Sequence, residues 1–188
     1  MPFEDMGDWG GFRVRANFGD VLEAFDALDA DLGEVIEAIQ DEGREELLKR
    51  SEPIVRYWEN PGGRFVAEVH ARKERPRRLE LRLYGDWLVT LLNYGTRAHE
   101  IVPRQAKALR FIWGGPGSYT AKTQPRMLGS GMGGPTGVET FRVRVWHPGF
   151  PGRRWLEMLA TDARHWFPEL VDKWLRWALE QLPSGMGD

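Results

Sequence analysis

The apolar residues between positions 18 and 58 recur every three or four positions, which predicts one long amphipathic helix. Asp20 is its expected N-cap, with Glu23 as the capping-box partner. Pro53 is expected to break or bend the helix near Lys49, because proline lacks an amide donor and crowds the carbonyl four residues earlier. The face opposite the apolar positions is strongly acidic.

Alternation of apolar and polar residues predicts two β-hairpins further along the chain. The first pairs residues 65–71 with residues 79–83, and the second pairs residues 109–113 with residues 138–146. In the last of these strands, the side chains expected to face inward are Phe141, Val143 and Val145, and those expected to face outward are Arg142 and Arg144.

A short helix and a glycine turn connect the two hairpins. Asp86 is the predicted N-cap of a helix over residues 87–92, which ends at the turn Tyr94-Gly95-Thr96. Gly95 is expected to adopt a backbone conformation that other residues resist. Residues 99–104 are predicted to be extended.

Residues 153–182 form the last predicted helix, in which Pro168 is expected to cause a kink or a split. These elements predict an α+β fold, with a long N-terminal helix and a C-terminal helix packed on a mainly antiparallel sheet of two hairpins. The whole chain, 1–188, is expected to be a single domain. Residues 1–17 are predicted to be an extended arm and residues 183–188 a frayed tail.

Residues 114–137 contain eight glycines and three prolines, which predicts a long flexible loop. Lys122 and Arg126 give this loop a mild positive charge. Residues 129–134 match the G-x-G-x-x-G pattern of dinucleotide-binding proteins, which requires a strand before it and a helix after it. A proline, a glycine and a predicted strand follow instead, so we reject a nucleotide site.

Composition and charge exclude several classes of protein. The absence of cysteine excludes disulfides, thiolate metal sites and cysteine nucleophiles, and leaves the redox compartment open. The net charge of −2 excludes a globally basic nucleic-acid-binding protein. The N-terminus lacks the pattern of a signal peptide. No apolar run approaches the ~18 residues of a membrane span, so no membrane partner is expected.

Charge is nevertheless unevenly distributed along the chain. Residues 20–46 contain eleven acidic residues and one basic residue, whereas residues 72–78 contain five basic residues and one acidic residue. A solvated surface explains both segments. The functional alternatives are a basic partner for the helix, and DNA phosphate or an acidic protein face for residues 72–78.

The four histidines offer little support for catalysis or metal binding. His165 and Glu169 lie one helical turn apart, with Asp162 on the same side, but Pro168 distorts that turn. We therefore predict no catalytic residue, no metal site, no cofactor and no enzymatic activity. The alternative is a metal-dependent hydrolase built on the histidines at positions 99, 147 or 165, which a metal assay would test.

Three segments occur in an order and spacing that resemble a known family. They are Asn93-Tyr94-Gly95-Thr96-Arg97-Ala98-His99-Glu100-Ile101, Lys107-Ala108-Leu109-Arg110-Phe111 and Arg144-Val145-Trp146-His147-Pro148-Gly149. Over residues 90–160 the chain is similar to the tail-component family of long-tailed bacteriophages, the neck or tail-completion proteins related to the lambda minor tail protein Z group. It departs from the family pattern after Pro53 and after Gly149.

The resemblance implies a structural virion protein without enzymatic activity. It would form a ring, expected to be a hexamer, at the head–tail joint or upper tail, after assembly in the host cytoplasm. Its partners would be further copies of itself and neighbouring neck and tail proteins, with DNA passing through the lumen without sequence-specific contacts. The resemblance does not distinguish a neck ring from a tail-completion or tail-terminator ring.

A ring needs two different surfaces that meet across subunits. We expect the acidic helix face to meet the basic residues 72–78 of the next subunit, which would set register more than affinity. The arm 1–17 and the loop 114–137 are expected to become ordered on assembly. The candidate interface residues are Glu34, Glu37, Asp41, Arg72, Lys73, Arg75, Arg77, Arg78, Tyr94, Gly95, Arg97, His99, Lys122 and Arg126. The alternative function is a nucleic-acid-binding module that uses residues 72–78.

Overall fold

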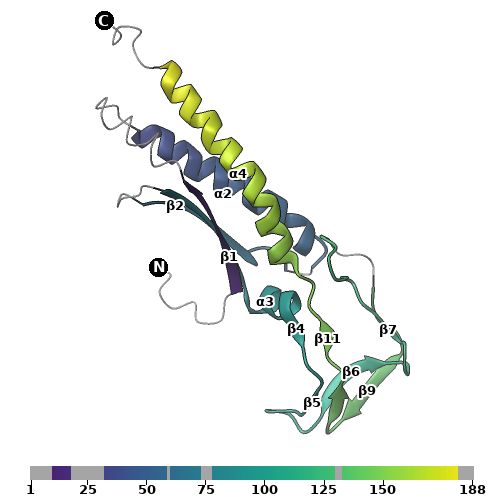
Figure 1. Ribbon diagram of the computed structural model, residues 1–188. Coiled ribbons are helices and arrows are strands. Elements are labelled where there is room, and N and C mark those ends of the chain that lie inside the picture. The colour runs from purple at the N-terminus through teal and green to yellow at the C-terminus, as the bar shows by residue number, and fades with distance from the viewer. Residues whose placement is uncertain (1–9, 18–31, 59, 73–77, 130–132, 182–188) are drawn as a thin grey trace, which may run out of the picture.

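The computed structural model describes residues 10–17, 32–58, 60–72, 78–129 and 133–181. They form an α+β fold with an elongated body and a narrow projecting arm (Figure 1). The body is a three-stranded sheet with two long helices on one face and one short helix at its end. The arm, residues 95–151, is a ribbon of paired strands that follows the short helix in the sequence and precedes the last helix.

The sheet of the body has the order β1-β3-β2, so β3 is its central strand. Its antiparallel strands are β1 Gly10–Asn17, β2 Phe65–Arg72 and β3 Arg78–Gly85. The first predicted hairpin is therefore confirmed. The side chains of Leu79, Leu81 and Leu83 are at most 1% exposed and form the floor of the core.

Strand β1 corrects the expectation of an N-terminal arm for residues 10–17. These residues pair along their whole length with β3, in the register Phe12↔Leu83 and Val14↔Leu81. Phe12 and Val14 thereby join the core on the same face as the leucines of β3. Contacts within the same chain hold this segment in place, because every second side chain of β1 buries its apolar surface under the helices. Residues 1–9 of the expected N-terminal extended segment lie outside the described residues.

Helices α2 Gly33–Val55 and α4 Trp155–Glu180 pack against each other and on this face of the sheet. Helix α2 lies over β2, and α4 lies over β1 (Figure 1). The expected helix start at Asp20 lies outside the described residues. The core between the layers includes Leu47 and Ile54 from α2 and Phe167 and Val171 from α4, all fully buried.

Neither internal proline divides its helix, so a break near Lys49 and a split at Pro168 are excluded, whereas the alternative bend and kink stay predictions. Pro53 lies in the last turn of α2, where only Ile54 and Val55 follow it, so little of the helix is left to divide. Pro168 lies in the middle of α4. Ala163 and Val171, on either side of it, are both fully buried, so packing against the body holds the two halves of α4 together.

The short helix α3 Trp87–Tyr94 begins as predicted. The carboxylate of Asp86 accepts a hydrogen bond from the backbone N–H of Val89 at 2.8 Å, which confirms Asp86 as the N-cap. Arg64 forms an ion pair with the same carboxylate and fixes the cap to the start of β2.

The arm consists of four successive two-stranded antiparallel ladders, β4–β11, β5–β10, β6–β9 and β7–β8. The outgoing strands are β4 Gly95–Thr96, β5 His99–Ile101, β6 Leu109–Trp113 and β7 Tyr119–Thr120. The returning strands are β8 Gly134–Pro135, β9 Val138–Arg142, β10 Val145–His147 and β11 Phe150–Pro151. The second predicted hairpin is confirmed for residues 109–113 and 138–142 as β6–β9, but its returning strand ends at Arg142, and Val145 and Trp146 pair with β5 instead. None of the helices in the described ranges has the length and apolar character needed to cross a membrane.

Candidate functional site

Gly95 joins α3 to the arm and confirms the prediction made for it. It has a φ of +78° and a ψ of −175°, a combination that glycine adopts and other residues resist. A Cβ added at this position would lie 2.4 Å from the carbonyl oxygen of Phe150. The absence of a side chain therefore lets the outgoing and returning strands of the arm meet at its base.

Asn93 joins α3 to α4 and was not singled out from the sequence. Its side chain is fully buried, and its Oδ1 accepts a hydrogen bond from the backbone N–H of Leu156 at 2.9 Å. Its Nδ2 donates to Glu157 at 3.1 Å. Asn93 thus caps α4 from another helix, because Arg154, the residue before α4, provides no side-chain cap. Burial raises the pKa of Glu157, but hydrogen bonds from Arg154 and Asn93 outweigh it and lower the pKa below its ordinary value.

Two histidines face each other near the base of the arm. His99 and His147 are directly paired across β5 and β10, with their ring centroids 5.2 Å apart. His99 Nδ1 lies 2.8 Å from the carbonyl oxygen of Arg97, and His147 Nδ1 accepts a hydrogen bond from the Gly149 N–H at 2.9 Å. Neutral His147 therefore carries its proton on Nε2, where it is a donor and not a metal ligand. Among the other turn candidates, the Arg97 side chain is exposed and Tyr94 is 56% exposed.

The arm carries large apolar side chains that no other part of the described chain covers. On the paired strands and the segment between them they include Ile112 at 47%, Phe141 at 55%, Trp146 at 67%, Val143 at 68% and Val138 at 71%. The expectation that Phe141 and Val143 face inward is therefore wrong. The alternation is present, but no helix or sheet of the described residues lies against either face of the ribbon. An extended exposed apolar surface of this kind marks an interaction site.

The arm is also basic, although the chain as a whole is not. Residues 95–151 contain eight Lys or Arg and two Asp or Glu, a formal charge of +6. Since the whole chain carries −2, the remaining residues carry −8. The described body is itself balanced in charge, and the excess of acidic residues lies in segments outside the described residues, so the net charge conceals a basic arm.

The loop 114–137, expected to be flexible, follows a defined path in its described part and returns to the base of the arm. The buried hydroxyl of Thr123 accepts a hydrogen bond from Arg153 Nε at 2.9 Å. The Arg126 N–H donates to the Arg153 carbonyl at 2.8 Å, and Trp155 Nε1 donates to the Met127 carbonyl at 2.8 Å. The side chains of the two candidates in this loop, Lys122 and Arg126, are exposed.

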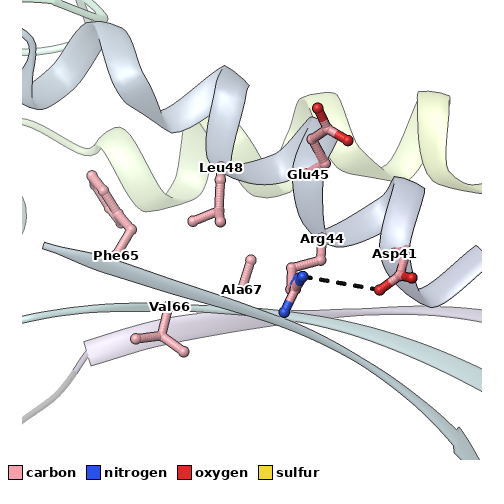
Figure 2. Close-up of a pocket in the computed structure, with 7 residues that line it drawn as sticks. All are labelled: Asp41, Arg44, Glu45, Leu48, Phe65, Val66 and Ala67. Atoms are coloured by element: carbon pink, nitrogen blue, oxygen red, sulfur yellow. Dashed lines mark ion pairs between the residues drawn. The ribbon is translucent and has the colours of Figure 1, made fainter. Parts of the chain in front are cut away.

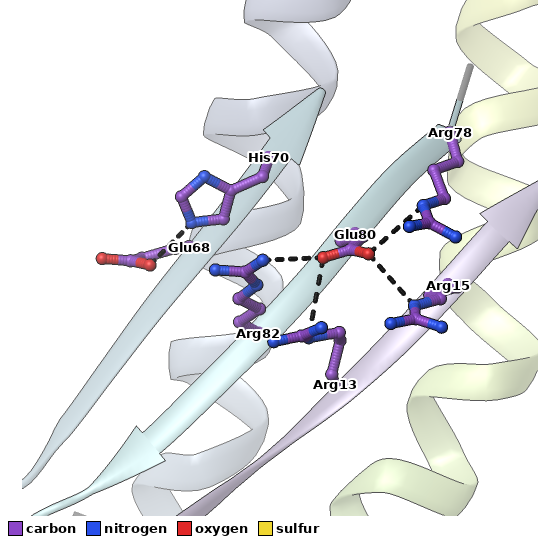
Figure 3. A network of polar contacts seen from close by, with 7 residues as sticks. All are labelled: Arg13, Arg15, Glu68, His70, Arg78, Glu80 and Arg82. Carbon is purple, nitrogen blue, oxygen red and sulfur yellow. Dashed lines mark hydrogen bonds and ion pairs between the residues drawn. The ribbon is translucent and has the colours of Figure 1, made fainter. Parts of the chain in front are cut away.

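The sheet face opposite the helices carries four arginines around one glutamate (Figure 3). Glu80, in β3, is fully buried. Its carboxylate lies 2.7 Å from Arg82 Nη2, 3.0 Å from Arg15 Nε, 3.4 Å from Arg78 Nε and 3.6 Å from Arg13 Nε. The hydrogen bond to Glu80 raises the pKa of Arg82 above its ordinary value, in spite of the opposing effect of burial.

We call these four arginines and Glu80 the arginine cluster. The alternation in β3 indicates that Arg78, Glu80 and Arg82 share a face, but only the pairing of β1 with β3 adds Arg13 and Arg15. The sequence interpretation missed the cluster, because it did not recognise β1 as a strand.

The acidic candidates Glu34, Glu37 and Asp41 are exposed on α2. Glu42, on the same helix, instead binds α4 through Lys173 Nζ and Trp174 Nε1, both at 2.8 Å. The hydrogen bond from Lys173 lowers the pKa of Glu42 below its ordinary value. Part of the acidic face is therefore used within the fold, and the rest remains at the surface.

Most of the basic residues proposed as interface residues in the segment 72–78 lie outside the described part of the chain. Lys73, Arg75 and Arg77 lie outside the described residues, and the side chain of Arg72 is not described. Arg78 belongs to the arginine cluster. The contact expected between this segment and the acidic helix of the next subunit stays a prediction.

Within the described ranges, no group of three or more His, Asp or Glu residues could hold a metal ion. Asp162, considered with His165 and Glu169, instead pairs with Arg50 at 2.6 Å. After the glycine pattern at 129–134, the next element is strand β9 and not a helix.

No protein-family model, curated protein or solved structure matches this chain.

Proposed function

We propose that this chain is a ring-forming structural protein of the neck or upper tail of a long-tailed bacteriophage. The phage assignment rests on the resemblance over residues 90–160. The assembly role rests on one observation, the uncovered apolar side chains of the basic arm. The candidates in the turn, Tyr94 to His99, then act mainly by holding the base of the arm in place.

The physical argument for assembly starts from the stability of the arm itself. A two-stranded ribbon without a covered face is at best marginally stable in water. Each square ångström of apolar surface that a partner covers contributes about 25 cal/mol, so the arm gains most when it lies on another molecule. Arm and body are different surfaces, as the head-to-tail contacts of a closed ring require.

Removing apolar side chains from the arm should weaken assembly. We expect Phe141→Ser combined with Trp146→Ser to raise the concentration at which the oligomer dissociates at least tenfold, about 1.4 kcal/mol. Both side chains are more than half exposed, so the stability of the monomer should change little. Sedimentation velocity over a concentration series measures the effect, and negative-stain microscopy shows the ring.

Trp177→Ser is the matched control, since Trp177 lies on α4 and is 42% exposed. It should leave assembly unchanged. A wild-type chain that stays monomeric up to the highest soluble concentration would contradict the proposed function.

Nucleic-acid binding is the second candidate, and the arginine cluster favours it. Four arginines surround one carboxylate on the sheet face that no described helix covers, so positive charge remains to meet phosphate. Such contacts carry no sequence information, which agrees with DNA passing through a ring.

Duplex DNA binding tests this second candidate. Arg13→Ala with Arg15→Ala should weaken binding and reduce the slope of log affinity against log salt by about 2. Lys49→Ala with Arg56→Ala removes the same charge from α2 and its C-cap, on the other side of the sheet, and should have a smaller effect. Equal effects of the two pairs, or no binding by the wild type, would rule this candidate out.

A further inference from the structure

A groove runs between α2 and the outer edge of β2 (Figure 2). Leu48, which is 38% exposed, and the strand residues 65–67 provide apolar lining. Asp41 and Glu45 provide acidic groups on the helix side. Arg44 is the one basic residue among those that line the groove, and it lies 3.9 Å from Asp41.

The backbone of β2 along this groove can accept another strand. The carbonyl of Arg64, next to β2, accepts from the Asp86 N–H, so the backbone of Arg64 points toward β3. Backbone direction alternates along an antiparallel strand, so Phe65, Ala67 and Val69 point outward. The Val69 carbonyl is already capped by Gln40 Nε2 at 3.0 Å. At Phe65 and Ala67, within the described part of the chain, no further strand pairs with this edge.

The charge beside the groove is negative and continuous. Glu34, Glu37, Asp41 and Glu45 are exposed and follow three- and four-residue steps, so they lie along one side of α2. With Arg44 they carry a formal charge of −3. A partner for this groove therefore needs an apolar strand edge and basic side chains.

The arm of the same protein has both properties. Strands β6 and β9 form a ribbon with two free edges in the described structure, and Val138, Phe141 and Trp113 on it are between 43% and 71% exposed. Arg142, in β9, and Arg144, just after it, are also exposed. Each five-residue strand is about 17 Å long, and residues 65–69 of β2, up to the carbonyl that Gln40 caps, span about the same length, so this part of the edge can accommodate the ribbon.

We propose that the groove between α2 and β2 receives the arm of a second copy of this chain, which adds its ribbon to the free edge of β2. This inference rests on the proposed function and names the two surfaces that meet. Backbone hydrogen bonds supply affinity, as in other cases of strand addition. The acidic residues of α2 and the arginines of the arm set orientation. The basic partner of the acidic helix is then the arm, and not residues 72–78.

Charge reversal on each surface tests the pairing. Asp41→Lys with Glu45→Lys reverses the groove, and Arg142→Glu with Arg144→Glu reverses the arm. Each pair alone should raise the dissociation concentration of the oligomer at least tenfold. A 1:1 mixture of the two variants should assemble again, because the wild-type arm fits the wild-type groove and the reversed arm fits the reversed groove. Glu169→Lys with Glu180→Lys makes the same charge change on exposed positions of α4 and should leave assembly unchanged.

Cross-linking provides a second test, which the absence of cysteine in this chain makes specific. A Leu48→Cys variant mixed with a Val138→Cys variant should give a cross-linked dimer with a short bis-maleimide. Leu179→Cys, on α4 and 49% exposed, should give none with Val138→Cys.

The outcomes separate this inference from the function on which it rests. Suppose that the chain assembles, that neither charge reversal weakens assembly, and that the Leu48–Val138 pair does not cross-link. This result would contradict the pairing of arm and groove but not the proposed ring. A chain that stays monomeric at every concentration contradicts both. If the arm reversal abolishes DNA binding while assembly is unchanged, the arm is a nucleic-acid surface and the inference is wrong.

Discussion

Replacing Glu80 with glutamine should destabilise the fold by about 3 kcal/mol. Glu80 is the carboxylate at the centre of the arginine cluster and is fully buried. Removing the charge of one buried partner typically costs about 3–5 kcal/mol, because the opposite charge is left without compensation. The lower end applies here, since the side chains of Arg13 and Arg15 are 42% and 51% exposed and keep part of their hydration. The side chains of Arg78 and Arg82 are only 27% and 20% exposed, so they keep less of their hydration.

Urea unfolding followed by circular dichroism measures this loss. Glu68→Gln is the matched control, because Glu68 lies on the neighbouring strand β2 and pairs with His70 at the surface (Figure 3). Its effect should stay below about 1 kcal/mol. Added salt should reduce the loss in the Glu80→Gln variant, because it screens the repulsion among the arginines. A loss equal to that of the control would show that water, and not Glu80, compensates the cluster.

Elements with local signals were predictable from the sequence. Asp86 precedes an apolar four-residue pattern and caps α3 through its own side chain. The first hairpin alternates clearly and is bounded by turn residues, so residues 65–71 and 79–83 were identified as its strands. In each case the residues that determine the structure lie within a few positions of one another.

Features that depend on distant partners were not predictable in this way. Residues 12–16 alternate as a strand does, but two glycines precede them and their partner, β3, lies more than sixty residues away. The arginine cluster depends on that pairing. Asn93 caps a helix sixty-three residues later in the sequence, which no local pattern indicates.

The arm shows a different limit of sequence patterns. Phe141, Val143 and Val145 alternate with arginines as the residues of a half-buried strand do. Alternation shows that a strand has two faces, but it does not show whether the chain itself supplies a layer to cover either of them. Here the described chain supplies no covering layer for either face. The alternation that usually indicates a half-buried strand therefore leaves Phe141 and Val143 exposed, where a partner can contact them.

Replacing Gly95 with alanine should cost about 3–4 kcal/mol of folding stability, for two separable reasons. Its combination of φ and ψ is one that costs a residue with a Cβ about 1–3 kcal/mol. The new methyl group would also lie 2.4 Å from the Phe150 carbonyl oxygen and 2.6 Å from the Gly152 nitrogen. These are backbone atoms of the returning strand, which can move only if the base of the arm opens.

Two other glycines separate these contributions in the same unfolding experiment. Gly63 has a φ of +71° and nothing within 4 Å of an added Cβ, so Gly63→Ala should cost about 1 kcal/mol through conformation alone. Gly62 has open space and no positive φ, so Gly62→Ala should change stability by less than about 1 kcal/mol. The excess loss in Gly95→Ala over Gly63→Ala then reports the close approach of β4 and β11 together with any higher conformational cost of the Gly95 backbone. Because that approach sets the direction in which the arm leaves the body, the same variant should also impair assembly at concentrations where it remains folded. If Gly95→Ala loses no more stability than Gly63→Ala and assembles normally, the glycine serves only the turn, and the position of the arm is set elsewhere.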